Sequence, residues 1–99
     1  MALVSVDPVS GEQVAVYDEH GPEEVVRILD RAVAAFEVGR STPFAERAAW
    51  LTRAADLLEQ RRGDLARLMA LEMGKPVAQG RAEADKCAWV CRHYADEAE

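Results

Sequence analysis

The sequence Met73-Gly74-Lys75-Pro76 divides the second half of this 99-residue chain into two helical stretches. Glycine ends helices because it tolerates the left-handed backbone of a C-terminal cap, and proline lacks the backbone N–H that would continue a helix. Before this stretch, leucine and methionine recur at helical spacing, which predicts a short helix over residues 64–73. After it, Pro76 suits the start of another helix, which we expect over residues 76–99.

Small side chains predominate on one face of the helix expected at 76–99, which permits a neighbouring helix to approach closely. That face consists of Ala84, Cys87, Ala88, Cys91, Ala95 and Ala98. Trp89, Val90 and Tyr94 widen the apolar arc beyond this stripe. The pattern reaches Glu99 without glycine, proline or a basic final turn, so we expect the sequence to end in the middle of a helix.

A longer helix is expected upstream, over residues 43–62. It opens at Thr42-Pro43, where a hydroxyl cap precedes a proline that fits the first turn. We expect Gly63-Asp64 to separate it from the next helix, with glycine ending one helix and aspartate capping the other. Its predicted buried stripe consists of Phe44, Ala48, Leu51, Ala55 and Leu58.

The start of the chain predicts a β-hairpin followed by an amphipathic helix. Alternating valines flank a run of turn-forming residues, which indicates a hairpin over residues 3–17. Gly21-Pro22-Glu23-Glu24 starts a helix over residues 22–38, because proline suits its first position and the glutamates meet the positive end of its dipole. Gly39 stands where a left-handed C-terminal cap is expected. The predicted fold class is therefore mainly α with an N-terminal β-hairpin.

Composition and charge favour a cytoplasmic helical protein over one that binds nucleic acid or a membrane. The chain has 18 acidic and 12 basic residues and a net charge of −6, whereas phosphate binding needs clustered lysine and arginine. Its densest basic stretch, residues 53–67, is interrupted by acidic side chains and is interpreted as a solvated helix face. No apolar run approaches the roughly 20 residues of a membrane span, and the first residues do not resemble a signal peptide.

No combination of residues predicts a catalytic, cofactor-binding or metal site. The six glycines are isolated, so the sequence has no glycine-rich phosphate loop. Cys87 and Cys91 have neither the spacing of a redox pair nor that of the usual zinc ligands. Both lie well inside a predicted helix among apolar residues, which favours reduced, buried packing side chains over catalytic nucleophiles. His20 and His93 are interpreted as solvent-facing or packing residues.

Several colinear segments resemble the aldehyde dehydrogenase superfamily and together cover essentially the whole chain. Asp7-Pro8-Val9-Ser10-Gly11-Glu12 resembles the family's N-P-A-T-G-E turn, with aspartate where asparagine is commoner; both side chains can accept hydrogen bonds from backbone amides of a turn. Residues 44–49 and 51–59 resemble the family's second helix, and Leu71-Glu72-Met73-Gly74-Lys75-Pro76 resembles its L-E-x-G-K-P loop. Glu83–Ala95 is especially similar to the helix after that loop in bacterial succinate-semialdehyde dehydrogenases.

The resemblance implies that residues 1–99 are the N-terminal portion of the cofactor-binding domain of an α/β dehydrogenase that uses NAD or NADP. In that family a cysteine thiolate attacks the aldehyde, and hydride then passes to the nicotinamide. A glutamate activates the water that hydrolyses the resulting thioester, and an asparagine helps hold the oxyanion. No position here matches those motifs. We therefore expect this chain alone to bind neither cofactor and to be inactive, whereas the family oxidises an aldehyde, here succinate semialdehyde, to the carboxylic acid.

Four residues acquire candidate roles only through the resemblance. Glu72 matches a position that helps bind a structural monovalent cation in some relatives, although an exposed loop carboxylate is the simpler interpretation. Cys87, Ala88 and Cys91 lie on the helix that borders the substrate tunnel, although packing in the core is favoured. The expected partner is the remainder of the dehydrogenase chain, or a second copy bound through apolar helix faces. A stand-alone helical interaction module is the alternative function.

Overall fold

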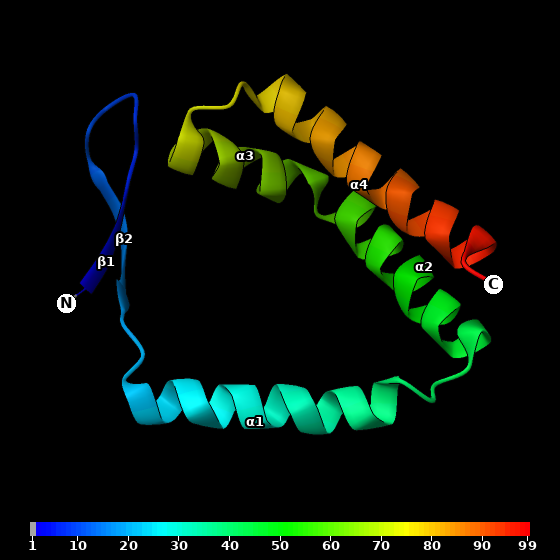
Figure 1. The fold of residues 1–99 in the computed structure, drawn as a ribbon. Coiled ribbons are helices and arrows are strands. Elements are labelled where there is room, and N and C mark those ends of the chain that lie inside the picture. Colours follow the sequence, from blue (N-terminus) through cyan, green and yellow to red (C-terminus); the bar gives the residue numbers. More distant parts are fainter. Residues whose placement is uncertain (1) are drawn as a thin grey trace.

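The computed structural model describes residues 2–99, which form a hairpin followed by four helices (Figure 1). The strands are β1 (Ala2–Val6) and β2 (Gln13–Asp18). The helices are α1 (Pro22–Gly39), α2 (Phe44–Gln60), α3 (Arg62–Met73) and α4 (Val77–Glu97). The predicted fold class, mainly α with an N-terminal β-hairpin, is confirmed.

The hairpin is held by its turn as well as by strand pairing. β1 and β2 are antiparallel, with Val4 opposite Val16 and an irregular register near the end of β1. Within the turn, the Val9 N–H donates to Asp7 Oδ1 at 2.8 Å, as the turn-like sequence predicts. This backbone hydrogen bond stabilises the carboxylate and lowers the pKa of Asp7 below its ordinary value of 3.8.

α4 packs along both α2 and α3, and its contact face is made of the smallest side chains (Figure 1). Among the described residues, the buried apolar side chains are Ala55, Ala66, Ala84 and Ala88, each no more than 1% exposed. Gly80 lies so close to α3 that a Cβ atom at this position would be only 2.9 Å from the Cα atom of Ala66. The three helices are therefore positioned by close backbone approach, because small side chains leave little to separate them.

The molecule is thin and open. It measures 47 × 39 × 15 Å, and its radius of gyration is 17.5 Å, whereas a compact domain of this length has about 13 Å. α1 crosses the open side, away from the unit formed by α2, α3 and α4, and none of its described residues is buried (Figure 1). The accessible surface of 7690 Å² exceeds the roughly 5,600 Å² of a compact monomer of this mass. Much of the surface that a compact chain of this mass would bury is therefore exposed to solvent.

Two predicted caps at the junction of α1 and α2 are wrong. Gly39 is the last residue of α1 and does not adopt the positive φ of a left-handed cap. The last carbonyls of α1 instead accept hydrogen bonds from side chains that follow the helix: Arg47 Nη2 donates to Gly39 O at 2.8 Å, and Thr42 Oγ1 donates to Val38 O at 3.3 Å. Thr42 therefore closes α1 and does not cap α2, whose N-terminus has no side-chain cap.

The boundaries of the later helices also differ from the predicted ones. The break between α2 and α3 lies at Arg61, so Gly63 and Asp64 belong to the first turn of α3. Arg61 leaves helical geometry only slightly, with φ −101° and ψ 10°, so the change of direction needs no glycine. Pro76 precedes α4 instead of starting it, and α4 ends at Glu97. Within the described part of the chain, no helix is both long and apolar enough to cross a membrane.

Candidate functional site

Ion pairs fix α4 against α2 and α3. Arg92 Nη2 donates to Asp56 Oδ1 at 2.9 Å and to Glu59 Oε2 at 3.0 Å, and these carboxylates raise the pKa of Arg92 above its ordinary range. Arg62 Nη1 donates to both carboxylate oxygens of Asp85, at 2.9 and 3.0 Å. All three carboxylates are engaged in holding helices together, so they are not placed as general bases.

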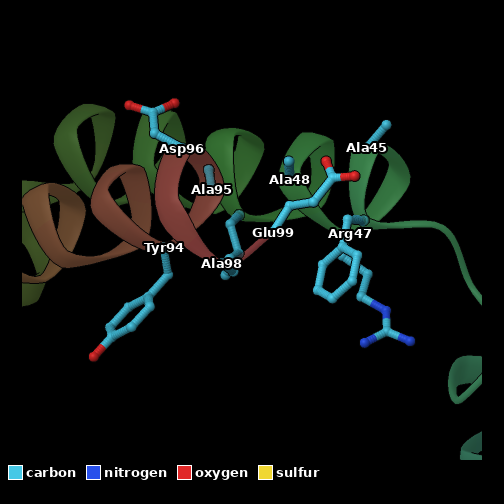
Figure 2. Close-up of a pocket in the computed structure, with 10 residues that line it drawn as sticks. Ala45, Arg47, Ala48, Tyr94, Ala95, Asp96, Ala98 and Glu99 are labelled. Atoms are coloured by element: carbon cyan, nitrogen blue, oxygen red, sulfur yellow. The ribbon is translucent and has the colours of Figure 1, made fainter.

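A hollow of about 190 Å³ lies between the start of α2 and the end of α4 (Figure 2). Alanines form much of its wall, and Figure 2 shows Tyr94 and Asp96 directed to different sides of α4. Arg47 already bonds the carbonyls at the end of α1, and its guanidinium lies 5.5 Å from the centroid of the Phe44 ring. Phe44 was predicted to be buried but is exposed. No set of polar groups converges on this hollow, so it lacks the machinery of a catalytic site.

The two cysteines do not both lie in the buried face, contrary to the prediction. Cys91 is half-buried, but Cys87 is exposed. The reason is that α2 and α3 cover the part of α4 that carries Ala84 and Ala88, and Cys87 lies at the edge of that face. Both thiols border a shallow hollow together with Val90. Among the three residues considered for the substrate tunnel, Ala88 is the one that the neighbouring helices enclose.

Another side of α4 presents aromatic rings. Trp89, Val90, His93 and Tyr94 line a hollow of about 250 Å³. The His93 and Tyr94 rings meet edge to face with centroids 5.2 Å apart, and the Trp89 ring lies 6.3 Å from that of His93. Trp89 and Tyr94 are 66% and 56% exposed. An aromatic surface this open is typical of a region that another part of a protein covers.

Glu72 and Gly74 attach the hairpin to the helices. The Ser5 hydroxyl donates to Glu72 Oε1 at 3.2 Å. Gly74 has φ 71°, which confirms the predicted glycine end of this helix, and a Cβ atom here would lie 3.2 Å from Pro8 Cγ. Among residues 2–99, no three histidine, cysteine or acidic side chains gather as metal ligands would. A cation-binding role for Glu72 stays a prediction.

The starts of α1 and α4 differ from the pyrophosphate sites of dinucleotide-binding folds. Pyrophosphate sites use a glycine-rich turn and free backbone N–H groups at a helix N-terminus. α1 instead begins with proline and two glutamates, whose charge opposes a phosphate. α4 follows Pro76, and the neighbouring Lys75 forms an ion pair with Glu83. Neither the start of α1 nor the start of α4 therefore has the free N–H groups and favourable charge of a pyrophosphate site.

Comparison with known proteins places these features in a larger enzyme fold. The model of the aldehyde dehydrogenase family matches residues 2–99. A probable succinate-semialdehyde dehydrogenase (NADP+) from Synechocystis sp. is 50% identical over 99 residues, which are 100% of this chain and 22% of that protein.

Solved structures agree with this match. NADP-dependent glyceraldehyde-3-phosphate dehydrogenase from Bacillus halodurans, complexed with NADP, superposes with a TM-score of 0.92 at 31% identity, over 99% of this chain and 21% of that one. Succinic semialdehyde dehydrogenase from Streptococcus pyogenes, in complex with NADP+, superposes with a TM-score of 0.90 at 28% identity, over 96% of this chain and 21% of that one. The chain thus spans about a fifth of the length of these proteins, and it belongs to the aldehyde dehydrogenase family.

Proposed function

We propose that this chain is the N-terminal portion of an aldehyde dehydrogenase that oxidises succinate semialdehyde to succinate with NADP+ as hydride acceptor. The observation that carries the proposal is the 50% identity to the Synechocystis relative, which extends over all 99 residues. The fold itself does not select the aldehyde, because a glyceraldehyde-3-phosphate dehydrogenase superposes as well as a succinic semialdehyde dehydrogenase. The identity of the substrate is therefore argued from the sequence.

The proposed contribution of residues 2–99 to that enzyme is structural. Oxidation of an aldehyde through a thioester needs a nucleophile, a base for water and donors for the oxyanion. The interhelical carboxylates of α2 and α4 are held in ion pairs. We expect no turnover from the chain alone, because loss of a catalytic nucleophile costs on the order of a millionfold in rate.

α4 is the element proposed to lie nearest the substrate. By resemblance to the family, this helix borders the tunnel that leads to the catalytic cysteine. Ala88 is enclosed by the neighbouring helices, which leaves Cys87 and Cys91 as the candidates to face the tunnel. Their side chains would then shape the passage of substrate without reacting with it.

A hybrid enzyme tests the proposal. These 99 residues would replace the matching segment of the Synechocystis relative, and NADP+ reduction would be followed with succinate semialdehyde. We expect kcat/KM within about tenfold of the parent, equivalent to ~1.4 kcal/mol of transition-state stabilisation, and no turnover from the chain alone. A hybrid with the Bacillus halodurans enzyme serves as the control and should lose more activity toward its own substrate.

Two results would contradict the proposal. One is a soluble, folded Synechocystis hybrid without turnover; the other is an enzyme-like rate from the 99-residue chain by itself. If both hybrids kept the same fraction of their parents' activity, the segment would fit the family but would not favour succinate semialdehyde.

The uncovered apolar surface favours one alternative, a stand-alone helical interaction module. Such a module would give the isolated chain a cooperative thermal transition and a well-dispersed amide NMR spectrum. A chain that belongs inside a larger enzyme would instead give a broad transition, exposed apolar surface and aggregation.

A further inference from the structure

Cys87 and Cys91 are two free thiols one helical turn apart on α4, at positions that share one face of the helix. Cys87 is exposed and Cys91 is half-buried, and both border one open hollow of about 470 Å³. The ion pairs that hold α4 against α2 and α3 use other side chains. What this pair of thiols can bind is therefore decided by its spacing and by the groups around the hollow.

The spacing of the two cysteines does not suit a disulfide within the helix. Side chains at this spacing have Cβ atoms about 5–6 Å apart, whereas a disulfide requires about 3.5–4.5 Å. An ion between the two sulfur atoms fits better. Metal–thiolate bonds of about 2.3 Å allow the sulfurs to lie up to about 4.6 Å apart, whereas the sulfurs of a disulfide are only about 2 Å apart. The pair is therefore spaced for a bridging ion.

The donors around the hollow restrict the kind of ion. Structural zinc takes four ligands, and iron–sulfur clusters take four thiolates. Among residues 2–99, no three histidine, cysteine or acidic side chains gather as metal ligands would. Glu83 also borders the hollow, but it forms an ion pair with Lys75. Two thiolates without further donors suit a soft monovalent ion such as Cu⁺, which prefers sulfur ligands and can be bound by two of them.

Lys86 places a positive charge beside the two thiols. Binding of Cu⁺ breaks both S–H bonds, forms two Cu–S bonds and releases two protons to solvent, so the complex carries one net negative charge. The Lys86 side chain borders the same hollow, and it forms no ion pair among residues 2–99. A nearby ammonium group stabilises the anionic complex relative to two neutral thiols.

α4 carries the two thiols on an anchored element. Ala84 and Ala88 of the same helix are buried where α4 packs on α2 and α3. Arg92, the neighbour of Cys91, donates to two carboxylates of α2 at 2.9 and 3.0 Å. A helix held in this way keeps the two thiols on one face before an ion arrives, which reduces the ordering cost of binding.

We propose that Cys87 and Cys91 form a two-coordinate site for a soft monovalent metal ion, Cu⁺, with the Lys86 ammonium as the balancing charge. The proposal rests on the juxtaposition of two free thiols at bridging spacing and one ammonium without an ion pair around a single hollow. It does not depend on the proposed oxidation of succinate semialdehyde, because binding of the ion needs neither the aldehyde nor the nicotinamide.

Titration with Cu⁺ tests the site in the full-length hybrid of these 99 residues with the Synechocystis relative. The ion is added without oxygen, with ascorbate as reductant, in competition with the chelator bathocuproine disulfonate. Cys87→Ser and Cys91→Ser each remove one ligand. Cys87→Ser/Trp89→Cys is the matched control, because it keeps the number of thiols but places the two about 200° apart around the helix.

We expect each serine variant to bind Cu⁺ at least about a hundredfold more weakly than the unchanged hybrid, because the second thiolate acts at a high effective concentration. The matched control should be weakened as much as Cys87→Ser. Lys86→Gln should weaken binding by only about three- to tenfold, and this loss should shrink at high salt. X-ray absorption should find two sulfur atoms at about 2.3 Å from the copper.

Alkylation with iodoacetamide, read by mass spectrometry, distinguishes this pair from the other cysteines of the hybrid. Cu⁺ should protect Cys87 and Cys91 together, and in Cys87→Ser it should leave Cys91 unprotected. Thiols that the reagent cannot reach in the metal-free hybrid, and that Cu⁺ leaves unchanged, would show that the rest of the enzyme covers them and would overturn the proposal.

Three other results would also overturn it. One is equal affinity of the unchanged hybrid and both serine variants for Cu⁺. Another is a matched control that binds the ion as tightly as the unchanged hybrid, since the spacing would then be irrelevant. The third is Zn²⁺ held as tightly as Cu⁺ with the same dependence on both thiols, which would contradict a two-coordinate site for a soft monovalent ion.

Discussion

Replacing Gly80 with alanine tests the contact that holds α4 against α3. The added Cβ atom would lie 2.9 Å from Ala66 Cα, 3.0 Å from Ala66 Cβ and 3.3 Å from Ala66 O. The nearest of these belongs to the backbone, so no side-chain rotation relieves the overlap. The two helices must separate locally, and separation loosens the packing of Ala84 as well.

Two opposing terms set the size of the effect. Alanine is favoured over glycine inside a helix by about 1 kcal/mol. Overpacking of a tight contact costs about 1–3 kcal/mol, and a backbone obstacle puts this site in the upper part of that range. We therefore expect a net loss of roughly 1–2 kcal/mol in the free energy of unfolding.

Urea denaturation of the full-length hybrid with the Synechocystis relative, followed by circular dichroism at 222 nm, measures the change, with Gly63→Ala as the matched control. At Gly63 the nearest atoms to an added Cβ are those of the Arg81 guanidinium, at 3.4 Å and beyond, and a flexible side chain can move away. The control should be neutral or slightly stabilising. Equal midpoints for the two variants would refute the close-approach interpretation. If the transition is too broad to fit, hydrogen exchange at the Ala66 and Ala84 amides should show the same loss of protection.

Three further predictions concern the hairpin and the thiols. Gly74→Ala should destabilise the chain by about 1–3 kcal/mol, because Gly74 has a left-handed φ and lies close to Pro8. Gly11→Ala is the control: Gly11 also has a positive φ, but no atom lies near an added Cβ. Equal melting temperatures for the two variants would contradict this prediction. The lowered pKa of Asp7 implies a contribution to stability that is complete above pH 3.8 and is lost as the pH falls through the folded-state pKa. Asp7→Asn should keep the turn and remove that pH dependence, which NMR titration of the hairpin measures. In the isolated chain, a thiol reagent should modify Cys87 before Cys91, because Cys87 is exposed and Cys91 is half-buried; the reverse order in mass spectra would contradict the fold.

The periodicity of apolar residues predicted where the helices lie more accurately than the capping rules predicted where they end. The stripe that contains Ala55 and the small-residue face that contains Ala84 both form real contacts, since periodicity reports which positions share a face. Gly39 and Asp64 carry the right residue types for caps, yet both lie inside helices. The carbonyls at the end of α1 are satisfied by Arg47, eight residues away from Gly39, and no local rule anticipates a bond to the next helix.

Cys87 shows a second limit of periodicity. A helical pattern identifies an apolar arc, but it does not say which half of the arc faces neighbours in the same segment. On α4, the half with Ala84 and Ala88 meets α2 and α3, and the half with Trp89 and Tyr94 stays open. The cysteine lies between the two halves, so only the positions of the neighbouring helices decide its exposure.

Side-chain size separates the internal contacts of this chain from those it leaves open. The fully buried side chains among residues 2–99 are alanines, whereas all six aromatic residues are at least 47% exposed. Large aromatic side chains usually dominate the energetics of a core or an interface. The aromatic residues lie outside the contact between α2, α3 and α4, so small residues set the spacing of these helices. The aromatic side chains remain on the exposed surface of the described residues. A chain built this way spaces its helices closely through alanine and glycine while its largest apolar side chains stay exposed.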